Sequence, residues 1–268
     1  MGPARIGAAA GPLVRAGGRP PGGAPAALAD INARAAHPAT LVQADLSIPD
    51  SIHAAADQVA RTVGHLDVLI NNAAVFDQTV RKPVFTPEGH ELFWATDHLG
   101  PFQLTASLSP LLAAAERPRV INVASKGLIA MPRIRIRFGR LDDASWYSPT
   151  RAYYHAKLAQ IMTTFTLADR VDAVCVQVPA VRLDPDRVAA LPWLLRTLYA
   201  PKNRFAVPAE RLGVAYARLA TGGEVAPGLY VDEDLRPVRA PAFAYDEAAR
   251  ARLWAESQAA TGHLDWAW

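Results

Sequence analysis

Two stretches decide the fold: Arg119-Val120-Ile121-Asn122-Val123-Ala124-Ser125 and Tyr153-Tyr154-His155-Ala156-Lys157. The first is a mostly apolar run that ends in a hydroxyl group, which is typical of a buried strand. The second opens an apolar segment that continues to Val171 and predicts a helix. Residues four apart lie one above the other on a helix, so we expect Tyr153 and Lys157 to share one face.

A tyrosine beside a lysine forms an acid–base pair. The ammonium favours the phenolate, so we expect Lys157 to lower the pKa of Tyr153 from its ordinary value of about 10. Ser125 would supply a hydrogen bond to an oxygen that gains negative charge, if the strand end brings it close. A Tyr and a Lys at this spacing also occur by chance in many helices, so the pair gains weight only from other motifs.

The chain has 268 residues, of which 51% are hydrophobic and 20% are charged. These values predict one large soluble domain, residues 27–268, preceded by an atypical Gly/Pro-rich segment, residues 1–26. The net charge is only +3. Arg133, Arg135 and Arg137 alternate with apolar residues, which predicts a strand or hairpin with one solvent-exposed face rather than a nucleic-acid site.

The single cysteine, Cys175, lies in an apolar run and cannot form an internal disulfide, which fits a reducing compartment. No run of 18 apolar residues predicts a membrane span, and the N-terminus lacks the pattern of a signal peptide. The seven histidines show no ligand spacing with cysteines or carboxylates, so no metal site is predicted. We expect a cytoplasmic monomer or homo-oligomer that binds neither nucleic acid nor membrane.

Short apolar strands alternate with helices along most of the chain. The predicted strands are 40–43, 66–70, 119–123, 173–178 and 228–231, and the predicted helices include 153–171, 209–220, 246–261 and one that begins at Thr86-Pro87-Glu88. This order predicts an α/β fold with a Rossmann-like, doubly wound parallel sheet. Ligands of such sheets bind beyond the carboxyl ends of the strands, which directs attention to Asp45, Asn72 and Ser125.

Five motifs stand in the order and approximate spacing of the short-chain dehydrogenase/reductase family. They are Asp45-Leu46, Asn71-Asn72-Ala73-Ala74, His98-Leu99-Gly100-Pro101-Phe102, Asn122-Val123-Ala124-Ser125 and Tyr153-x-x-x-Lys157. The chain resembles this family over roughly residues 13–262. It is most similar to the retinol-dehydrogenase-type carbonyl reductases, through the His98 motif, Thr86-Pro87-Glu88-Gly89 and Leu253-Trp254-Ala255-Glu256-Ser257.

The resemblance implies a ketoreductase that uses NADP(H). Tyr153 would protonate the carbonyl oxygen of a small hydrophobic substrate. Lys157 would depress the pKa of Tyr153 and hold the ribose, and Ser125 would position the substrate oxygen. A Tyr proton and a Ser hydrogen bond are what would stabilise the oxyanion that develops as a carbonyl gains a hydride.

The resemblance also assigns three residues to the adenosine side of the cofactor. Asp45 would reach the adenine, and Asn72 would lie beside the adenosine. Arg19 would pair with the 2′-phosphate, which favours NADP over NAD.

Four departures from the family pattern surround the cofactor. The Gly-rich phosphate turn has no match before Leu13, and the nearest run, Gly7-Ala8-Ala9-Ala10-Gly11, lacks a preceding apolar strand. We therefore predict that the N-terminal strand and glycine-rich loop are missing or altered. The family's catalytic Asn is Asp97, which we include among the catalytic residues. Pro179-Ala180 replaces Pro-Gly, and Leu183 stands near the place of the Thr that holds the nicotinamide amide.

Two accounts of these departures remain open, beside a non-catalytic binding relative. In the first, the chain is a ketoreductase whose N-terminal segment is truncated or altered by a reading-frame change. In the second, dinucleotide binding is lost, and Tyr153, Lys157 and Ser125 transfer protons in a cyclisation, dehydration or isomerisation. Residues 184–207 lie where the family has a variable lid, and their apolar side chains favour a bulky hydrophobic ketone. The resemblance extends to ketoreductases of aromatic polyketide (anthracycline-type) antibiotic pathways.

Overall fold

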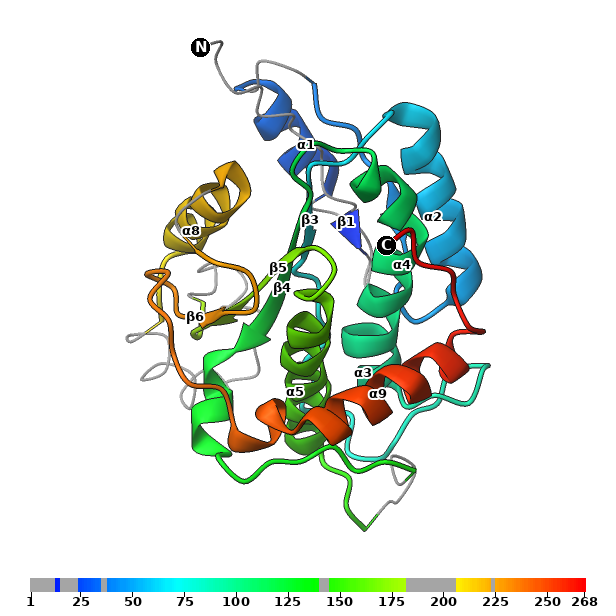
Figure 1. The fold of residues 1–268 in the computed structure, drawn as a ribbon, viewed down its shortest axis with the longest axis vertical. Coiled ribbons are helices and arrows are strands. Elements are labelled where there is room, and N and C mark those ends of the chain that lie inside the picture. The colour runs from blue at the N-terminus through cyan, green and yellow to red at the C-terminus, as the bar shows by residue number, and fades with distance from the viewer. Residues whose placement is uncertain (1–12, 15–23, 35–37, 140–144, 182–205, 223–224) are drawn as a thin grey trace.

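Helices and strands alternate along the chain (Figure 1). The computed structural model describes residues 13–14, 24–34, 38–139, 145–181, 206–222 and 225–268. The helical elements in these residues are α1 (Ala24–Asn32), α2 (Pro49–Thr62), α3 (Leu92–Trp94), the π-helix η1 (Ala95–Leu99), α4 (Gly100–Ala113), the 3-10 helix η2 (Lys126–Ala130), α5 (Pro149–Leu167), α8 (Ala209–Thr221), the 3-10 helix η3 (Ala242–Tyr245) and α9 (Glu247–Ala260).

The parallel sheet is described in two parts. Its strands are β1 (Leu13–Val14), β2 (Gln43–Ala44), β3 (Val68–Asn71), β4 (Arg119–Ser125), β5 (Asp172–Val178) and β6 (Tyr230–Val231). The last four are hydrogen bonded in chain order, and β1 pairs with β2; every pair is parallel. Within the described residues, no strand links β1 and β2 to β3. The α/β class and the Rossmann-like parallel sheet are confirmed.

Helices cover both faces of this sheet. Val120 packs in a core cluster with side chains of α2, α4 and α5, whereas Ile121 and Val123 pack with side chains of α8. Figure 1 shows α2, α4 and α5 on one side of the strands and α8 on the other. Successive strand residues point to opposite faces, so a strand with two covered faces is apolar throughout. This burial explains why β4 is mostly apolar up to the half-buried Ser125, with Arg119 and Asn122 as its other polar residues.

One helical segment, residues 92–113, contains the π-helical turn η1. Such turns insert an extra residue into an α-helix and often occur at functional sites. The segment begins where Glu91 Oε2 accepts the backbone N–H of Trp94 at 2.9 Å. The helix start predicted at Thr86 is therefore wrong: Thr86 instead forms a turn with His90 around Gly89, whose φ is 82°.

The arginine-rich segment keeps its predicted alternation without forming a strand. Arg133, Arg135 and Arg137 are exposed, and Ile136 between them is buried. The backbone N–H of Arg137 donates to His155 Nε2 at 2.7 Å. The segment is therefore held against α5 by a side chain, which is why the prediction of a strand or hairpin was wrong.

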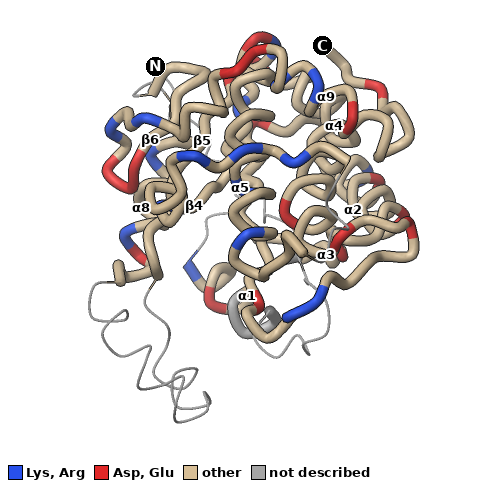
Figure 2. The backbone as a smooth tube through the Cα atoms, turned by 90° about the horizontal axis from the view of Figure 1, so that it is seen from below, with Lys and Arg blue, Asp and Glu red and all other residues tan. Residues whose placement is uncertain are grey.

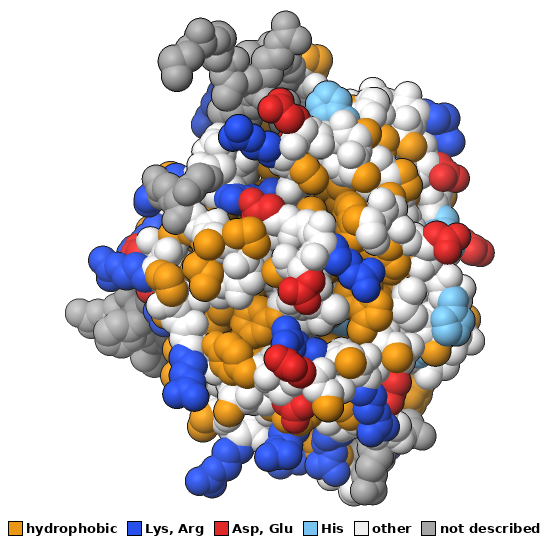
Figure 3. Space-filling model, viewed as in Figure 1, with side chains coloured by type: hydrophobic (Ala, Val, Ile, Leu, Met, Phe, Trp, Pro, Cys, Tyr) orange, Lys and Arg blue, Asp and Glu red, His pale blue; other side chains and the backbone are white. Residues whose placement is uncertain are grey.

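The described surface is mixed in character. Basic and acidic residues are interspersed along the backbone (Figure 2), and hydrophobic side chains lie between charged ones on the face that carries α5 and α9 (Figure 3). Of the helices that the structure describes, none combines the length and apolarity that a bilayer crossing requires.

Candidate active site

Tyr153 and Lys157 lie on one face of α5. The helix begins at Pro149, whose fixed φ suits the first helical position. Ser148 caps it, because the Ser148 Oγ accepts the backbone N–H of Arg151 at 3.2 Å. One turn separates the two side chains, and Lys157 Nζ lies 5.8 Å from the centroid of the Tyr153 ring.

Lys157 Nζ and Ser125 both lie near the carboxyl end of β4. The Lys157 side chain is buried, and its Nζ donates to the carbonyl oxygen of Val123 at 3.0 Å. Ser125 is the last residue of the strand, and its Oγ accepts the backbone N–H of Gly127 at 3.3 Å. The Ser125 side chain also lies close enough to Tyr153 to lower the pKa of its phenol. A substrate oxygen placed beside both hydroxyl groups would receive a hydrogen bond from each.

The pKa of Tyr153 is raised, which corrects the expectation that Lys157 lowers it. Burial has the largest effect, because it removes water from the phenolate, and the negative charge of Asp97 adds to it. The Ser125 side chain lowers the pKa but does not offset the two opposing effects. At neutral pH Tyr153 therefore carries its proton, which is the state that a proton donor needs.

Asp97 lies in the π-helical turn and interacts with both Lys157 and Tyr153 through its charge. The residue is fully buried. Its Oδ1 accepts the backbone N–H of Val75 at 2.7 Å, and its Oδ2 has no hydrogen-bond partner among the described residues. Burial raises the pKa of Asp97 to about 7, although Lys157 and the N–H of Val75 lower it. This carboxyl group therefore gains or loses a proton near neutral pH.

The charge of Asp97 also acts on Lys157. Burial lowers the pKa of Lys157, because the ammonium loses its water, and the neighbouring Asp97 opposes that effect. Burial therefore favours the neutral form of each group, while their mutual attraction favours the charged pair. An Asn at this position, which does not ionise, would remove this coupling.

The residues expected near the adenosine make contacts of their own. Asp45 follows β2, and its Oδ1 accepts the backbone N–H of Ser47 at 2.9 Å and the Ser47 hydroxyl at 2.6 Å. Asn72 follows β3, and its Oδ1 accepts the hydroxyl of Tyr216 on α8 at 2.9 Å. Arg19 lies outside the described residues. The structure thus brings together Tyr153, Lys157, Ser125 and Asp97, whereas among the described residues no hydrogen bond links Asp45 to Asn72.

Two of the departures from the family pattern follow β5, and the structure describes only the first, Pro179-Ala180. Pro179 and Ala180 are half-buried and follow the end of β5. The backbone N–H of Val207 donates to the carbonyl oxygen of Ala180 at 2.9 Å. Leu183 and the predicted lid, apart from residues 206 and 207, lie outside the described residues.

Two residues near the site were missed by the sequence analysis. Gln160 Nε2 donates to the backbone carbonyl oxygen of Asp97 at 2.8 Å. Gln160 lies seven residues after Tyr153, two helical turns along the same face, so the helical period could have identified it. Phe76 packs on the ring of Tyr153 with 4.5 Å between ring centroids. Phe76 lies in a loop far from α5 along the chain, so no sequence pattern indicated that it contacts Tyr153.

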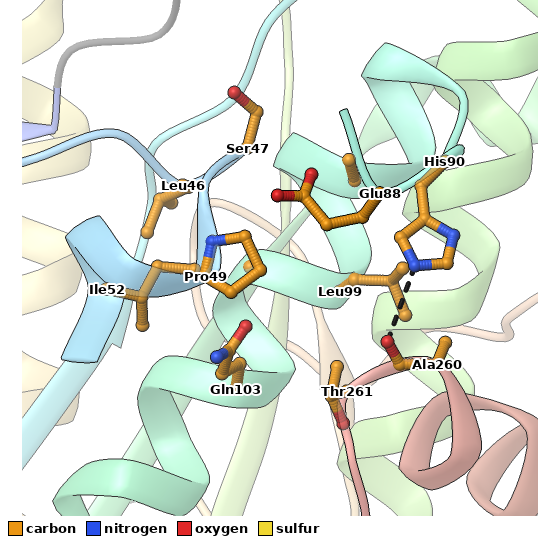
Figure 4. A pocket seen from close by; sticks show the side chains of 12 residues that line it. Leu46, Ser47, Pro49, Ile52, Glu88, His90, Leu99, Gln103, Ala260 and Thr261 are labelled. Carbon is orange, nitrogen blue, oxygen red and sulfur yellow. Dashed lines mark hydrogen bonds between the residues drawn. The ribbon is translucent and has the colours of Figure 1, made fainter. Parts of the chain in front are cut away.

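A small pocket lies away from these residues, between the start of α2, the π-helical turn and the end of α9 (Figure 4). Leu46, Pro49, Glu88 and Gln103 are among its lining residues, and its volume of about 20 Å³ suits one water molecule. His90 Nε2 lies 3.4 Å from the carbonyl oxygen of Ala260 at its edge. The pocket is too small for a dinucleotide or a bulky ketone.

Comparison with known proteins identifies the family. A family model of the short chain dehydrogenases matches residues 4–134. Human retinol dehydrogenase 12 is 33% identical over 215 residues, which cover 78% of this chain and 66% of that protein. A solved structure of an uncharacterized protein from Mycobacterium paratuberculosis has a TM-score of 0.63 and 25% identity, covering 90% of this chain and 81% of that chain.

A short chain dehydrogenase from Escherichia coli CFT073, solved in complex with NADPH, has the same fold. Its TM-score is 0.56 at 18% identity, and the match covers 81% of this chain and 83% of that chain. The protein belongs to the short-chain dehydrogenase/reductase family, and within it is similar to the retinol dehydrogenases. The chain spans 58% to 66% of the length of the first curated relatives that it matches.

Proposed function

We propose that this protein is an NADP(H)-dependent oxidoreductase that reduces the carbonyl group of a hydrophobic small molecule, with Tyr153 as proton donor. The observation that carries the proposal is the convergence of Tyr153, Ser125 and Lys157 at the carboxyl end of β4. Membership of an oxidoreductase family supports the reaction class. The finer form of the proposal is a bulky ketone, such as the side-chain ketone of an aromatic polyketide.

Reduction of a carbonyl group needs a hydride at carbon and a proton at oxygen. NADPH supplies the hydride when it is bound. The hydroxyl groups of Tyr153 and Ser125 would hydrogen-bond the substrate oxygen, and these bonds strengthen as that oxygen gains negative charge. Tyr153 then gives its proton to the oxygen. The phenolate that remains would be stabilised by the Ser125 side chain, which lowers the pKa of Tyr153.

The residues present fit a dinucleotide in part. Lys157, next to Tyr153, would hold the nicotinamide ribose. Asp45 is half-buried and uses only Oδ1 in its described hydrogen bonds, so Oδ2 is available to the adenine. Asn72 is exposed at the end of β3, where the adenosine side would lie. For Arg19, pairing with the 2′-phosphate remains a prediction from sequence.

Replacement of Tyr153 by Phe tests the role of the phenol. Tyr153→Phe should lower kcat for NADPH-dependent ketone reduction by about 10²- to 10⁴-fold, the usual contribution of a positioned proton donor. Tyr154→Phe removes the neighbouring hydroxyl group and is the matched control, with little change expected. Nicotinamide fluorescence during titration with NADPH measures cofactor binding separately. A Tyr153→Phe variant with nearly full kcat, or a wild type that binds no NADPH at millimolar concentration, would refute the proposal.

The buried carboxyl group of Asp97 favours a second candidate, a cofactor-independent cyclase, dehydratase or isomerase. A carboxyl group with a pKa of about 7, beside a phenol and an amine, is well matched to proton abstraction at neutral pH. The two candidates differ in their need for NADPH. Turnover of a candidate substrate that persists without NADPH, and that Asp97→Asn abolishes, would support proton transfer alone. A protein that turns over no substrate under either condition would fit a non-catalytic binding relative.

A further inference from the structure

Phe76 lies against the side chain of Tyr153. The two ring centroids are 4.5 Å apart and the ring planes are inclined by 33°, within the usual range for offset aromatic pairs. The Lys157 ammonium also lies over the Tyr153 ring, at 5.8 Å from its centroid. These neighbours fix the direction of the phenol. Phe76 itself is 39% exposed, although one side of its ring packs on the half-buried ring of Tyr153.

Both ends of the Phe76 loop are held. Before it, the backbone N–H of Val75 donates to Asp97 Oδ1 at 2.7 Å. After it, Asp77 Oδ1 accepts the backbone N–H of Thr79 at 2.8 Å in a tight turn. The carbonyl oxygen of Val80 then accepts the hydroxyl of Tyr147 at 3.2 Å. The exposed face of Phe76 is therefore presented by an ordered loop, which lowers the entropic cost of binding against it.

We propose that Phe76 selects substrates that carry a flat aromatic group directly attached to the reacting carbonyl carbon. The inference rests on the proposed function, because Tyr153 and Ser125 define where the carbonyl oxygen lies. Phe76 touches the Tyr153 ring, so the atoms next to that carbonyl lie beside the exposed part of Phe76. A planar group can stack there, whereas a puckered or short alkyl group loses most of that contact.

Two matched ketones test this selection. Acetophenone carries a flat ring on the carbonyl carbon, and cyclohexyl methyl ketone carries a puckered ring of similar size. With wild-type protein and NADPH we expect kcat/KM to be higher for acetophenone. Phe76→Ala should lower the acetophenone value by roughly tenfold and the cyclohexyl value by less than threefold. Phe76→Leu, which keeps apolar bulk without a flat face, should also lose the preference.

Phe85→Ala is the matched control, because Phe85 is a similarly exposed phenylalanine (45%) without a ring contact to Tyr153 among the described residues. It should leave the preference for acetophenone unchanged. Thermal unfolding of each variant checks that the fold is retained. An equal fall in kcat for both ketones, with a shifted pH profile, would mean that Phe76 only orients Tyr153, and would overturn the inference.

Failure of the proposed function is distinguished by a binding measurement that needs no turnover. Saturation-transfer NMR reports binding of acetophenone to the protein directly. If the wild type reduces neither ketone, a signal for acetophenone that is lost in Phe76→Ala and kept in Phe85→Ala would still support the flat-ring site. The same signal in all three proteins, or in none, would overturn it.

Discussion

Asp97 should make the free energy of unfolding decrease as the pH rises, and Asp97→Asn should remove that pH dependence. In the unfolded chain the carboxyl group ionises at its ordinary pKa of 3.8, whereas in the folded protein its pKa is about 7. Between these values the folded state holds a proton that the unfolded state has lost, so a higher pH favours unfolding. The difference of roughly three pH units corresponds to about 4 kcal/mol, reached in full above pH 7.

Urea unfolding of the wild type and of Asp97→Asn at pH 5, 6 and 7 measures this effect. The amide keeps an acceptor for the N–H of Val75 and does not ionise. We expect the free energy of unfolding of the variant to rise relative to the wild type by roughly 2 kcal/mol between pH 5 and pH 7, since the slope flattens near the folded pKa. Asp57→Asn, on the exposed part of α2, controls for the loss of one acidic group.

The range stops at pH 7 because Lys157 also acts on Asp97, and its lowered pKa makes its own contribution at higher pH. Glu91 acts on Asp97 too, and burial raises the pKa of Glu91 to about 6, so it titrates within the range in both proteins. A difference between the two proteins that stays constant from pH 5 to pH 7 would refute the reasoning. It would mean that Lys157 holds Asp97 ionised throughout. The carboxyl group would then be a fixed anion beside Tyr153, and the second candidate function would lose the observation that favours it.

Two further substitutions test the packing that supports the site, both by urea unfolding. Gly100→Ala should lower the free energy of unfolding by about 1 to 3 kcal/mol, because the new Cβ would lie 2.8 Å from Leu46 Cβ and press on the Leu46 carbonyl oxygen; Gly213→Ala on α8, with nothing within 4 Å, should instead stabilise by up to about 1 kcal/mol. Arg119→Met should lower the free energy of unfolding by about 3 kcal/mol, because Arg119 donates hydrogen bonds of 2.8 Å to the Asp172 carboxylate and to the carbonyl oxygen of Leu219, and both would lose their donor. A change near zero would contradict this.

The sequence predicted the elements whose signal is local. The strand β4 and the helix α5 were recognised because most of their residues are apolar and most are buried. Element ends were less accurate: the helix expected from residue 153 begins at Pro149, where Ser148 caps it. At Thr86 the capping pattern was present, but a glycine at positive φ turns the chain before the helix begins.

The site was predicted where spacing along one element decides geometry, and not where tertiary contacts decide it. A spacing of four positions on a helix places Tyr153 beside Lys157, and the end of a parallel strand places Ser125 near both. The pKa of Tyr153 could not be obtained in this way. It depends on burial and on Asp97, which comes from another helix 56 positions earlier in the chain.

Buried polar groups, rather than apolar packing alone, fix the position of the π-helical turn relative to α5. Asn71 Nδ2 donates to Asn122 Oδ1 at 2.8 Å, and Asn122 Nδ2 donates to Thr164 Oγ1 at 2.9 Å. The Thr164 hydroxyl donates to the carbonyl oxygen of Gln160 at 2.8 Å, and Gln160 Nε2 donates to that of Asp97.

An unpaired polar group in this interior would cost about 1 to 3 kcal/mol, so a shift of either helix that breaks the chain is penalised at several bonds together. Apolar contacts tolerate small sliding movements, whereas hydrogen bonds of this length do not. The chain of bonds runs from β3 through β4 and α5 to the turn that carries Asp97. The sheet therefore sets the separation between Asp97 and Tyr153, and with it the balance of charge on which proton transfer depends.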